Sequence, residues 1–322
     1  MKKIVLYILF LLFSINISFA QRLLTANLVI NPSFEQYTNC PNNGSQIAFA
    51  YPWSDGLNGA GSSDFFHICS LSTTILNSIN IQYPRTGGGE TGIYLYGDWI
   101  ENNYREYIFG MLYDSLKKSK QYCGELYTAL YNYSRGAIEN VGMFFSADTL
   151  WNFDTVNGLP GLFSTIPQIE NNKGIISDTV NWVKVCGSFI ANGGEKYLVI
   201  GNFKDNLHTN YVEFIGAVGP YYYFDDVSVC ECSFDINLGQ DTTLCESETI
   251  ILNPNLPNAT YTWQDSSHTA TYEVKQPGTY WVRAYVADYD VYSSDTIVIT
   301  QGDENFCNPQ LTIPNVITPN GD

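Results

Sequence analysis

Hydrophobic and polar residues alternate along Tyr221–Val229, the clearest such pattern in the chain. Val227 and Val229 flank Ser228 there, which is the two-residue period of a β-strand with one buried face. By the same alternation Asp225 points to the face of Val227, toward the interior. A carboxylate in that position is costly unless it is paired or binds a metal ion. The stretch therefore predicts a β-strand that carries a buried acid.

Other short stretches show strand patterns, and long polar loops separate them. The strands predicted in the first two thirds of the chain are 27–35, 64–70, 93–97, 122–131, 137–146, 180–189, 196–203 and 221–229. Residues 148–173 are expected to form a long polar loop. Many short strands with long connections indicate a β-sandwich. Asn102–Lys118 is the exception, since its apolar residues roughly follow helical spacing and predict a helix, although a pair of strands remains an alternative.

A second hydrophobic pattern begins at Leu238. Tyr261–Trp263 predicts a strand with a buried tryptophan, and Gly278–Val282 has the Gly-x-Tyr spacing of a tyrosine corner. Val282 stands where an antibody domain has its second cysteine, so we predict an immunoglobulin-like sandwich without the central disulfide. The expected organisation is an all-β chain with a first domain over 21–235, a smaller one over 236–300, a linker over 301–310 and the start of a third domain over 311–322.

Residues 1–20 have the features of a secretory signal peptide. Lys2 and Lys3 supply the positive start, 4–13 is a short apolar run, and Ser18–Ala20 offers small residues for cleavage. The apolar run is too short to span a membrane. We therefore expect an exported protein that is not inserted into a membrane.

The composition narrows the function further. The chain has 24 Tyr and 18 Phe with only 15% charged residues, which favours β structure. Its formal net charge of −17 argues against nucleic acid and anionic membrane surfaces as partners, because both require a basic face. Divalent cations and neutral ligands are compatible with this charge.

Eight cysteines in an exported chain indicate disulfides rather than metal thiolates. Proximity favours a pair between Cys40 and Cys69, and weaker proposals pair Cys123 with Cys186 and Cys245 with Cys307. Cys230 and Cys232 are expected to bridge to two different partners, although many connectivities remain possible.

Three segments resemble known families. The residues PNVITPNGD at 314–322 resemble the opening of the gliding-motility-associated C-terminal domain, the type B sorting domain of the Bacteroidota type IX secretion system, which this chain enters but does not complete. Residues 238–282 resemble the immunoglobulin-like or PKD-like repeats that precede this sorting domain in surface adhesins. The resemblance implies export by the type IX machinery and a cell-surface or extracellular location, attached to the outer membrane or released.

The pairing of NLVINPSFE at 27–35 with YYYFDDVSV at 221–229 resembles the jelly-roll carbohydrate-binding modules of the galactose-binding-like class. In such modules the first and last strands lie together, and acidic residues on them hold a structural calcium ion. Carried over, this implies a calcium site involving Glu35, Asp225 or Asp226, and carboxylate oxygens suit calcium. The alternative is that Asp225 accepts backbone hydrogen bonds at a strand end while Asp226 faces water.

Sugar binding requires aromatic faces with polar groups at the rim. Trp53, Trp99, Tyr94 and Tyr104 lie in or beside loop-rich stretches and are candidates for such a platform. The alternative is that these aromatic residues fill the core of the sandwich.

Catalysis has little support in the sequence. His67, beside Asp64, is better explained as a hydrogen-bonded residue at a strand end. Glu101 and Glu106 are better explained as surface charge than as a pair of glycosidase carboxylates. We therefore expect a non-catalytic, adhesin-like protein that binds glycans through loops on a β scaffold. The alternatives are a structural gliding-motility or surface-layer component that binds other proteins, and an accessory module of a hydrolase.

Overall fold

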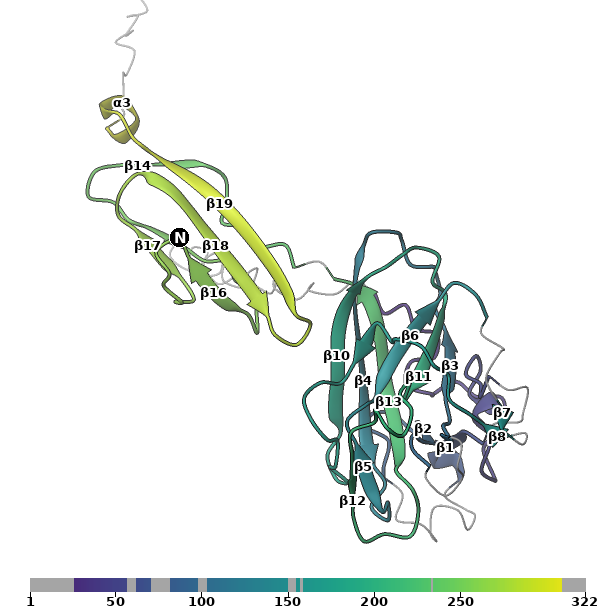
Figure 1. Ribbon diagram of the computed structural model, residues 1–322. Helices are drawn as coiled ribbons and strands as arrows, with labels where there is room; N and C mark the ends of the chain where they lie inside the picture. The colour runs from purple at the N-terminus through teal and green to yellow at the C-terminus, as the bar shows by residue number, and fades with distance from the viewer. Residues whose placement is uncertain are drawn as a thin grey trace, which may run out of the picture. The chain divides into compact units, whose positions relative to one another are not determined.

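The computed structural model is a chain of β-strands in two compact units, one within residues 22–233 and one from Phe234 onward (Figure 1). It describes residues 26–56, 62–70, 82–97, 103–149, 155–156, 159–232 and 234–308. The predicted signal peptide and the sorting-domain segment lie outside these residues. No helix in the described part of the chain is long and apolar enough to cross a bilayer.

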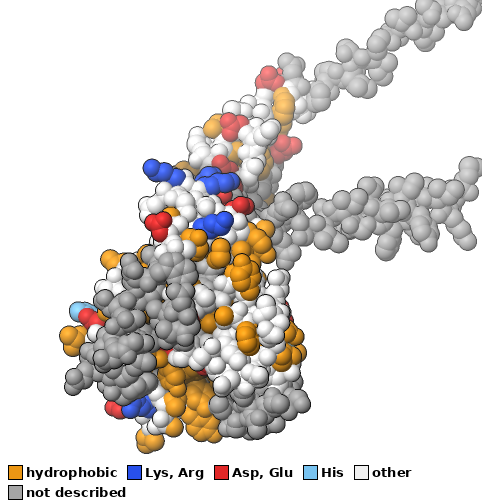
Figure 2. Space-filling view, turned by 90° about the vertical axis from the view of Figure 1, so that its right-hand side faces the viewer, with side chains coloured by type: hydrophobic (Ala, Val, Ile, Leu, Met, Phe, Trp, Pro, Cys, Tyr) orange, Lys and Arg blue, Asp and Glu red, His pale blue; other side chains and the backbone are white. Residues whose placement is uncertain are grey.

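The larger unit is a jelly-roll β-sandwich with two principal sheets, and Figure 2 shows one face of it with hydrophobic side chains exposed in several places. One sheet has the strand order β1-β2-β13-β4-β10 and the other the order β3-β11-β6-β9 (Figure 1). The strands of the first sheet are β1 (Asp64–His67), β2 (Gly89–Tyr94), β13 (Tyr221–Glu231), β4 (Gln121–Leu130) and β10 (Val183–Ile190). Those of the second are β3 (Ile108–Met111), β11 (Tyr197–Gly201), β6 (Gly142–Ser146) and β9 (Ile169–Glu170). Two short pairs join β12 (Tyr211–Glu213) to β5 (Gly136–Ile138) and β7 (Thr155–Val156) to β8 (Leu159–Pro160).

Strand β13 occupies the centre of the first sheet, as its pattern predicts. Val227, Val229 and Asp225 are all buried, and a register shift interrupts the pairing with β4 after Asp225. Residues near the start of the described chain run beside β13, since the Leu28 amide donates to the Val229 carbonyl at 2.7 Å. The prediction that the first and last segments of this module lie together is therefore confirmed.

The predicted helix over Asn102–Lys118 is wrong. This segment contains strand β3 and single bridges at Tyr104 and Leu112. The apolar residues suit a strand because Ile108 faces the core while Phe109 faces outward, and pairing with β11 supplies the backbone hydrogen bonds. Residues 137–146 similarly form two strands, β5 and β6, rather than one.

The smaller unit also has two sheets. The four-stranded sheet has the order β14-β19-β18-β16, and the other sheet pairs β15 with β17. The bounds are β14 (Thr242–Leu244), β15 (Ile250–Leu252), β16 (Thr260–Trp263), β17 (Tyr272–Val274), β18 (Gly278–Val286) and β19 (Val291–Gln301), followed by the short helix α3 (Glu304–Cys307). Trp263 is fully buried as predicted, and its indole N–H donates to the Thr269 carbonyl at 2.9 Å. Tyr280 donates to the carbonyl of Gln276, the kind of contact that the tyrosine-corner spacing predicts.

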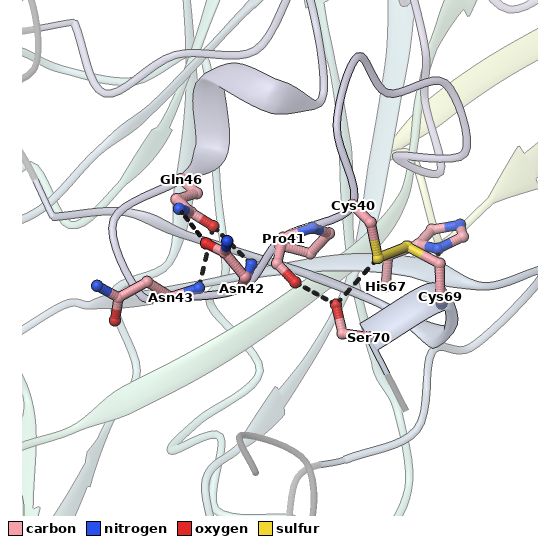
Figure 3. Close-up of a disulfide and its surroundings, with 8 residues drawn as sticks. All are labelled: Cys40, Pro41, Asn42, Asn43, Gln46, His67, Cys69 and Ser70. Atoms are coloured by element: carbon pink, nitrogen blue, oxygen red, sulfur yellow. Dashed lines mark hydrogen bonds between the residues drawn. A yellow bond between two sulfur atoms is a disulfide. The ribbon is translucent and has the colours of Figure 1, made fainter. Parts of the chain in front are cut away.

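Three disulfides stabilise the two units. The bonds Cys40–Cys69 and Cys245–Cys307 confirm two of the predicted pairs, and Figure 3 shows the first of them beside His67 and Ser70. Such bonds are typical of proteins that fold outside the reducing cytosol.

The predicted pair Cys123–Cys186 is wrong, because Cys123 bonds to Cys232. Cys186 lies opposite Glu125 in the β10–β4 register, which places it two residues from Cys123 along the ladder. Cys230 lies directly opposite Cys123 in the pairing of β13 with β4. The partner of Cys123 therefore comes from the β13 side of β4 and not from the β10 side. Cys186 and Cys230 take part in none of the three bonds. The expectation that Cys230 and Cys232 bridge to two different partners is therefore wrong, since only Cys232 is bonded.

Candidate functional site

The outer face of the sheet β3-β11-β6-β9 carries aromatic residues in place of the usual polar ones. Its register forms two rows, one joining Met111, Tyr197 and Ser146 and the other joining Phe109, Val199 and Phe144. The sheet therefore carries apolar side chains on both faces. An outward apolar face of this kind is normally covered by another segment or binds a ligand.

One half of this face is covered by the chain itself. Phe163 packs against Phe144 and Tyr107, and its amide donates to the Tyr107 hydroxyl at 2.9 Å. The Tyr107 hydroxyl donates in turn to the Asn202 carbonyl at 2.9 Å. The aromatic rings of this half therefore pack on one another as a cluster.

The other half is open and forms a pocket of about 400 Å³. Its walls come from β3, from β11 and from the segment before them, and the lining residues are Ala48, Tyr51, Pro52, Trp53, Ser54, Phe109, Gly110, Met111, Thr149, Tyr197 and Val199. None of the lining residues that the structure describes is charged. The lining combines aromatic rings with the hydroxyl groups of tyrosine, serine and threonine, which suits a neutral ligand that has both apolar faces and hydroxyl groups.

A network around Asn31 holds the rim of this pocket in place. The buried Asn31 side chain donates to the carbonyls of Ala50 and Tyr51 and also accepts from the Gln36 amide. Residue 54 pairs with Phe109, so the rim continues the sheet beyond its edge strand. Tyr51 projects from this fixed segment with 69% of its surface exposed.

Trp53 lines the pocket but is mainly an anchor of the core. Only 1% of its surface is exposed, its ring centroid lies 4.8 Å from that of Phe34, and its indole N–H donates to the Asn31 carbonyl at 2.7 Å. A ring enclosed in this way presents no broad face to a sugar, which matches the alternative that aromatic residues fill the core.

Two other predicted platform residues, Tyr94 and Tyr104, are not among the residues that line this pocket. Tyr104 is 9% exposed and its hydroxyl donates to Oε1 of Glu106 at 2.6 Å, while Tyr94 packs against Tyr221 at 4.8 Å between ring centroids. Trp99 lies outside the described residues. The four candidates are therefore not shown to form one surface.

Glu106 is not a surface charge, contrary to the expectation from the sequence. It is 1% exposed and accepts hydrogen bonds from Tyr104, from the Ser62 hydroxyl and from the Tyr94 amide. Burial is the main cause that raises the pKa of Glu106 to about 7, although these hydrogen bonds act in the opposite direction. Glu101 lies outside the described residues.

His67 has the structural role that its position predicts. Its Nδ1 accepts from the Cys69 amide at 3.1 Å, and its ring packs on Tyr37 at 4.3 Å. Burial lowers the pKa of His67 despite the opposing charge of Glu35. The imidazole is thus placed at the Cys40–Cys69 disulfide rather than at the pocket.

The structure brings Glu35, Asp225 and Asp226 to the same loop, residues 85–89. Glu35 Oε1 accepts from the amides of Gly88 at 2.8 Å and Gly89 at 3.0 Å. A side chain on Gly87, which has φ of 61°, would collide with this carboxylate. The glycines at positions 87–89 therefore pack closely around the Glu35 carboxylate, and the amides of Gly88 and Gly89 bind it.

Asp226 is fully engaged by side chains. It forms an ion pair with Arg85 and accepts hydrogen bonds of 2.6 Å from both Ser33 and Thr86. The pKa of Asp226 is lowered by these hydrogen bonds and by Arg85, even though burial alone would raise it. Its role here is to hold the loop as a carboxylate.

Asp225 and Glu90 form a different kind of pair. Asp225 is fully buried and accepts from the amides of Thr86 and Asp226, and burial raises its pKa to about 7. Glu90 is also fully buried, and neither of its carboxylate oxygens has a hydrogen-bond partner among the described residues. Burial and then the charge of Asp225 raise the pKa of Glu90 well above its usual value. Two acids in one buried region with so few donors require protons or a cation.

The metal prediction remains untested. Within the described part of the chain, no three His, Cys, Asp or Glu side chains are grouped so as to hold a metal ion. Any ion beside Glu90 and Asp225 would therefore need further oxygen ligands of another type, such as backbone carbonyls.

Sequence reasoning missed Tyr51, Phe109, Tyr197 and Glu90. The signal for Phe109 and Tyr197 was present, because β3 and β11 carry large apolar residues at consecutive positions and so cannot have a polar outer face. Tyr51 lies on neither strand and gave no such signal. The sequence gives no indication that Glu90 is a site residue, because it follows a run of glycines and is expected to lie in a loop.

Comparisons with known proteins leave the family open. No family model matches the chain, and no curated protein matches it significantly. Similar solved structures include the K1 cleaved adhesin domain of Lys-gingipain from Porphyromonas gingivalis. The sequence identity is 12%, the similarity covers 65% of this chain and 100% of that chain, and the TM-score is 0.32. The xylan-binding CBM22-1 domain of Paenibacillus barcinonensis Xyn10C has 14% identity, coverage of 65% and 97%, and a TM-score of 0.32. TmCBM61, solved with β-1,4-galactotriose, has 12% identity, coverage of 64% and 99%, and a TM-score of 0.26. These values are too low to assign a family or a ligand to this chain.

Proposed function

We propose that the larger unit is a non-catalytic glycan-binding module and that its ligand site is the pocket between Tyr51 and Tyr197. The observation that carries this proposal is the outer face of the sheet β3-β11-β6-β9, which is apolar and open beside β3. A pyranose ring has an apolar face that stacks on aromatic rings and hydroxyl groups that pair with Ser54 and Thr149. The pocket volume of about 400 Å³ is within the range of small-ligand sites.

The uncharged side chains of the described lining favour a neutral ligand. A carboxylate or ammonium group would lose its hydration in this pocket and gain no ion pair, which costs several kcal/mol. We therefore infer a neutral sugar unit, either at a chain end or within a neutral polysaccharide.

Binding to neutral polysaccharides and to a glycan array tests this proposal. We expect Tyr197→Ala and Tyr51→Ala to weaken binding about tenfold or more, which corresponds to the loss of one aromatic contact of about 1.4 kcal/mol. Tyr113→Ala is a matched control, since Tyr113 is 59% exposed and lies outside the pocket. Equal binding by all three variants would contradict the proposal. Capture of one surface protein without any glycan affinity would favour the structural alternative.

We also propose a structural calcium ion held by Glu90 and Asp225. The two oxygens of Glu90 that have no partner fit this ion, because calcium binds carboxylate oxygens and would supply the missing positive charge. Glu35 and Asp226 would support the site by fixing residues 85–89, since Oε1 of Glu35 accepts from two amides of this loop and Asp226 accepts from hydroxyls and pairs with Arg85.

The proposed location is the cell surface or the extracellular space, reached through the type IX secretion system. This rests on the resemblance of residues 314–322 to a sorting domain and agrees with the three disulfides. Fractionation of cells with and without a functional type IX system tests it, and retention in the periplasm only in the deficient cells is the expected result.

A further inference from the structure

A second surface with a definite chemistry lies on the smaller unit, on the outer face of β16, β18 and β19. Side chains alternate along β18, so that Val282 and Ala284 are buried while Trp281 and Arg283 are exposed. The register places Trp281 opposite Thr296, Arg283 opposite Ser294, and Tyr285 opposite Tyr292. We call this set of six residues the Arg283 platform.

Charge is segregated around this platform. Residues 234–308 contain eleven acidic residues, seven Asp and four Glu, but only two basic ones, Lys275 and Arg283. None of the six platform residues is acidic, and Asp295, which alternates with them, turns inward and accepts from the Leu238 amide at 2.7 Å. The six platform residues therefore carry one charge, the positive charge of Arg283, while the Asp290 carboxylate borders the platform at Tyr285.

Of the two cations, only Arg283 has its charge available to a ligand. Lys275 forms an ion pair with Glu273 at 2.9 Å, whereas Arg283 has no ion pair with any described residue. An exposed guanidinium that is not paired with a described carboxylate is complementary to an anion.

Aromatic stacking holds the guanidinium in position. Arg283 Cζ lies 3.9 Å from the centroid of the Tyr292 ring, and Tyr292 stacks on Tyr285 at 4.6 Å with an interplanar angle of 26°. The Tyr285 hydroxyl donates to Asp290 Oδ1 at 3.1 Å and so fixes the far end of the stack. One flat side of the guanidinium is thus occupied, while its N–H groups can pair with the two oxygens of a carboxylate.

We propose that the Arg283 platform binds an acidic polysaccharide, with a uronate carboxylate on Arg283 and a sugar ring on Trp281. Trp281 is 40% exposed and stands two residues from Arg283 on the same face, about 7 Å along the strand. That spacing is comparable with the distance between neighbouring sugar units. Ser294 and Thr296 on the adjacent strand place hydroxyl groups beside both, where they can pair with sugar hydroxyls. This site differs in charge from the neutral pocket of the larger unit and does not depend on it.

Binding of the purified full chain to polygalacturonate, compared with neutral dextran, tests the proposal by affinity electrophoresis and calorimetry. We expect polygalacturonate to bind and its affinity to fall as salt is raised, because an exposed ion pair is screened. Arg283→Gln should weaken binding about tenfold or more, as expected for loss of a charge-assisted pair. Arg283→Lys should recover only part of it, since an ammonium lacks the planar fork. Trp281→Ala should weaken binding at all salt concentrations.

Two controls separate this site from the rest of the chain. Lys275→Gln removes the other cation of the unit and should leave binding unchanged, and Tyr197→Ala should affect only neutral glycans. The proposal is overturned if polygalacturonate fails to bind, if Arg283→Gln binds as well as the unmodified chain, or if polyglutamate competes as strongly as polygalacturonate. Strong competition by polyglutamate would mean that Arg283 recognises negative charge alone, and the partner would then be an acidic protein. Circular dichroism of each variant checks that the fold is retained.

Discussion

The hydroxyl of Tyr104 donates a 2.6 Å hydrogen bond to Oε1 of Glu106, and both side chains are buried against β2. Oε2 of the same carboxyl accepts from the Tyr94 amide at 2.8 Å. These bonds do not compensate fully for the burial of the charge, which raises the pKa of Glu106 to about 7. The folded chain therefore binds a proton at this site in a pH range where the unfolded chain has lost it.

This difference predicts a stability that falls as pH rises. The stabilising effect is fully present below pH 4.5, the ordinary value for glutamate, and is lost as pH rises through about 7. Between pH 5.5 and 8.5 the Glu106 contribution should fall by about 2 kcal/mol. Glu106→Gln keeps an acceptor for Tyr104 but does not titrate. Denaturant unfolding at both pH values should therefore show a smaller pH dependence in this variant.

A surface acid provides the comparison. Glu213→Gln changes an exposed carboxylate on β12 and should leave the pH dependence of the free energy of unfolding unchanged. An identical pH dependence in Glu106→Gln and the unmodified chain would show that Glu106 does not carry the effect.

Trp53 should contribute to stability far more than to ligand binding. Trp53→Ala removes a ring packed on Phe34 and the hydrogen bond to the Asn31 carbonyl, so we expect a loss of about 3–5 kcal/mol in the free energy of unfolding. Tyr51→Ala, two residues away and exposed, should change it by less than about 0.5 kcal/mol. Denaturant unfolding measures both. A nearly unchanged stability in Trp53→Ala, together with lost glycan binding, would contradict this prediction and support Trp53 as part of the sugar-binding platform.

The contrast between these residues shows what the sequence predicts well. The alternation in Tyr221–Val229 predicts β13 and the burial of Asp225, because a two-residue period is a local property of the chain. The pocket depends on which outward rows of β3 and β11 the neighbouring segments leave uncovered, and that is set by packing between distant segments. In the same way Glu90 meets Asp225 only after the register of β2 and β13 is fixed, so neither residue by itself identifies the pair.

The calcium proposal makes a separate prediction. Calcium in 100-fold excess over its dissociation constant should add about 2.7 kcal/mol to the stability at pH 7.5, which raises the melting temperature of the larger unit by roughly 5–10 °C. Chelation with EGTA should reverse this shift. Glu90→Gln and Asp225→Asn should abolish the response to calcium, because each removes a carboxylate from the buried pair.

Glu35→Gln is the matched control for the calcium site. Glutamine retains an oxygen that can accept from the amides of Gly88 and Gly89, so the loop should keep its shape and the calcium response should persist. Loss of the response in Glu35→Gln would instead favour Glu35 as a ligand, as the sequence resemblance implies. A melting temperature that is insensitive to calcium and EGTA in the unmodified chain would count against the ion altogether.

Cys123 lies directly opposite Cys230 in the β4–β13 ladder but bonds to Cys232, two residues further along. Paired residues in a ladder have Cβ atoms about 4.5–5.5 Å apart, close to the separation that a disulfide needs. We therefore expect Cys232→Ser to form a Cys123–Cys230 bond and to lose little stability, whereas Cys123→Ser should lose about 2–4 kcal/mol because no equivalent cross-strand bond remains. Peptide mapping under non-reducing conditions identifies the bond, and Cys186→Ser should leave the map unchanged. A reduced Cys123 in the Cys232→Ser chain would show that the register alone does not bring these two sulfur atoms together.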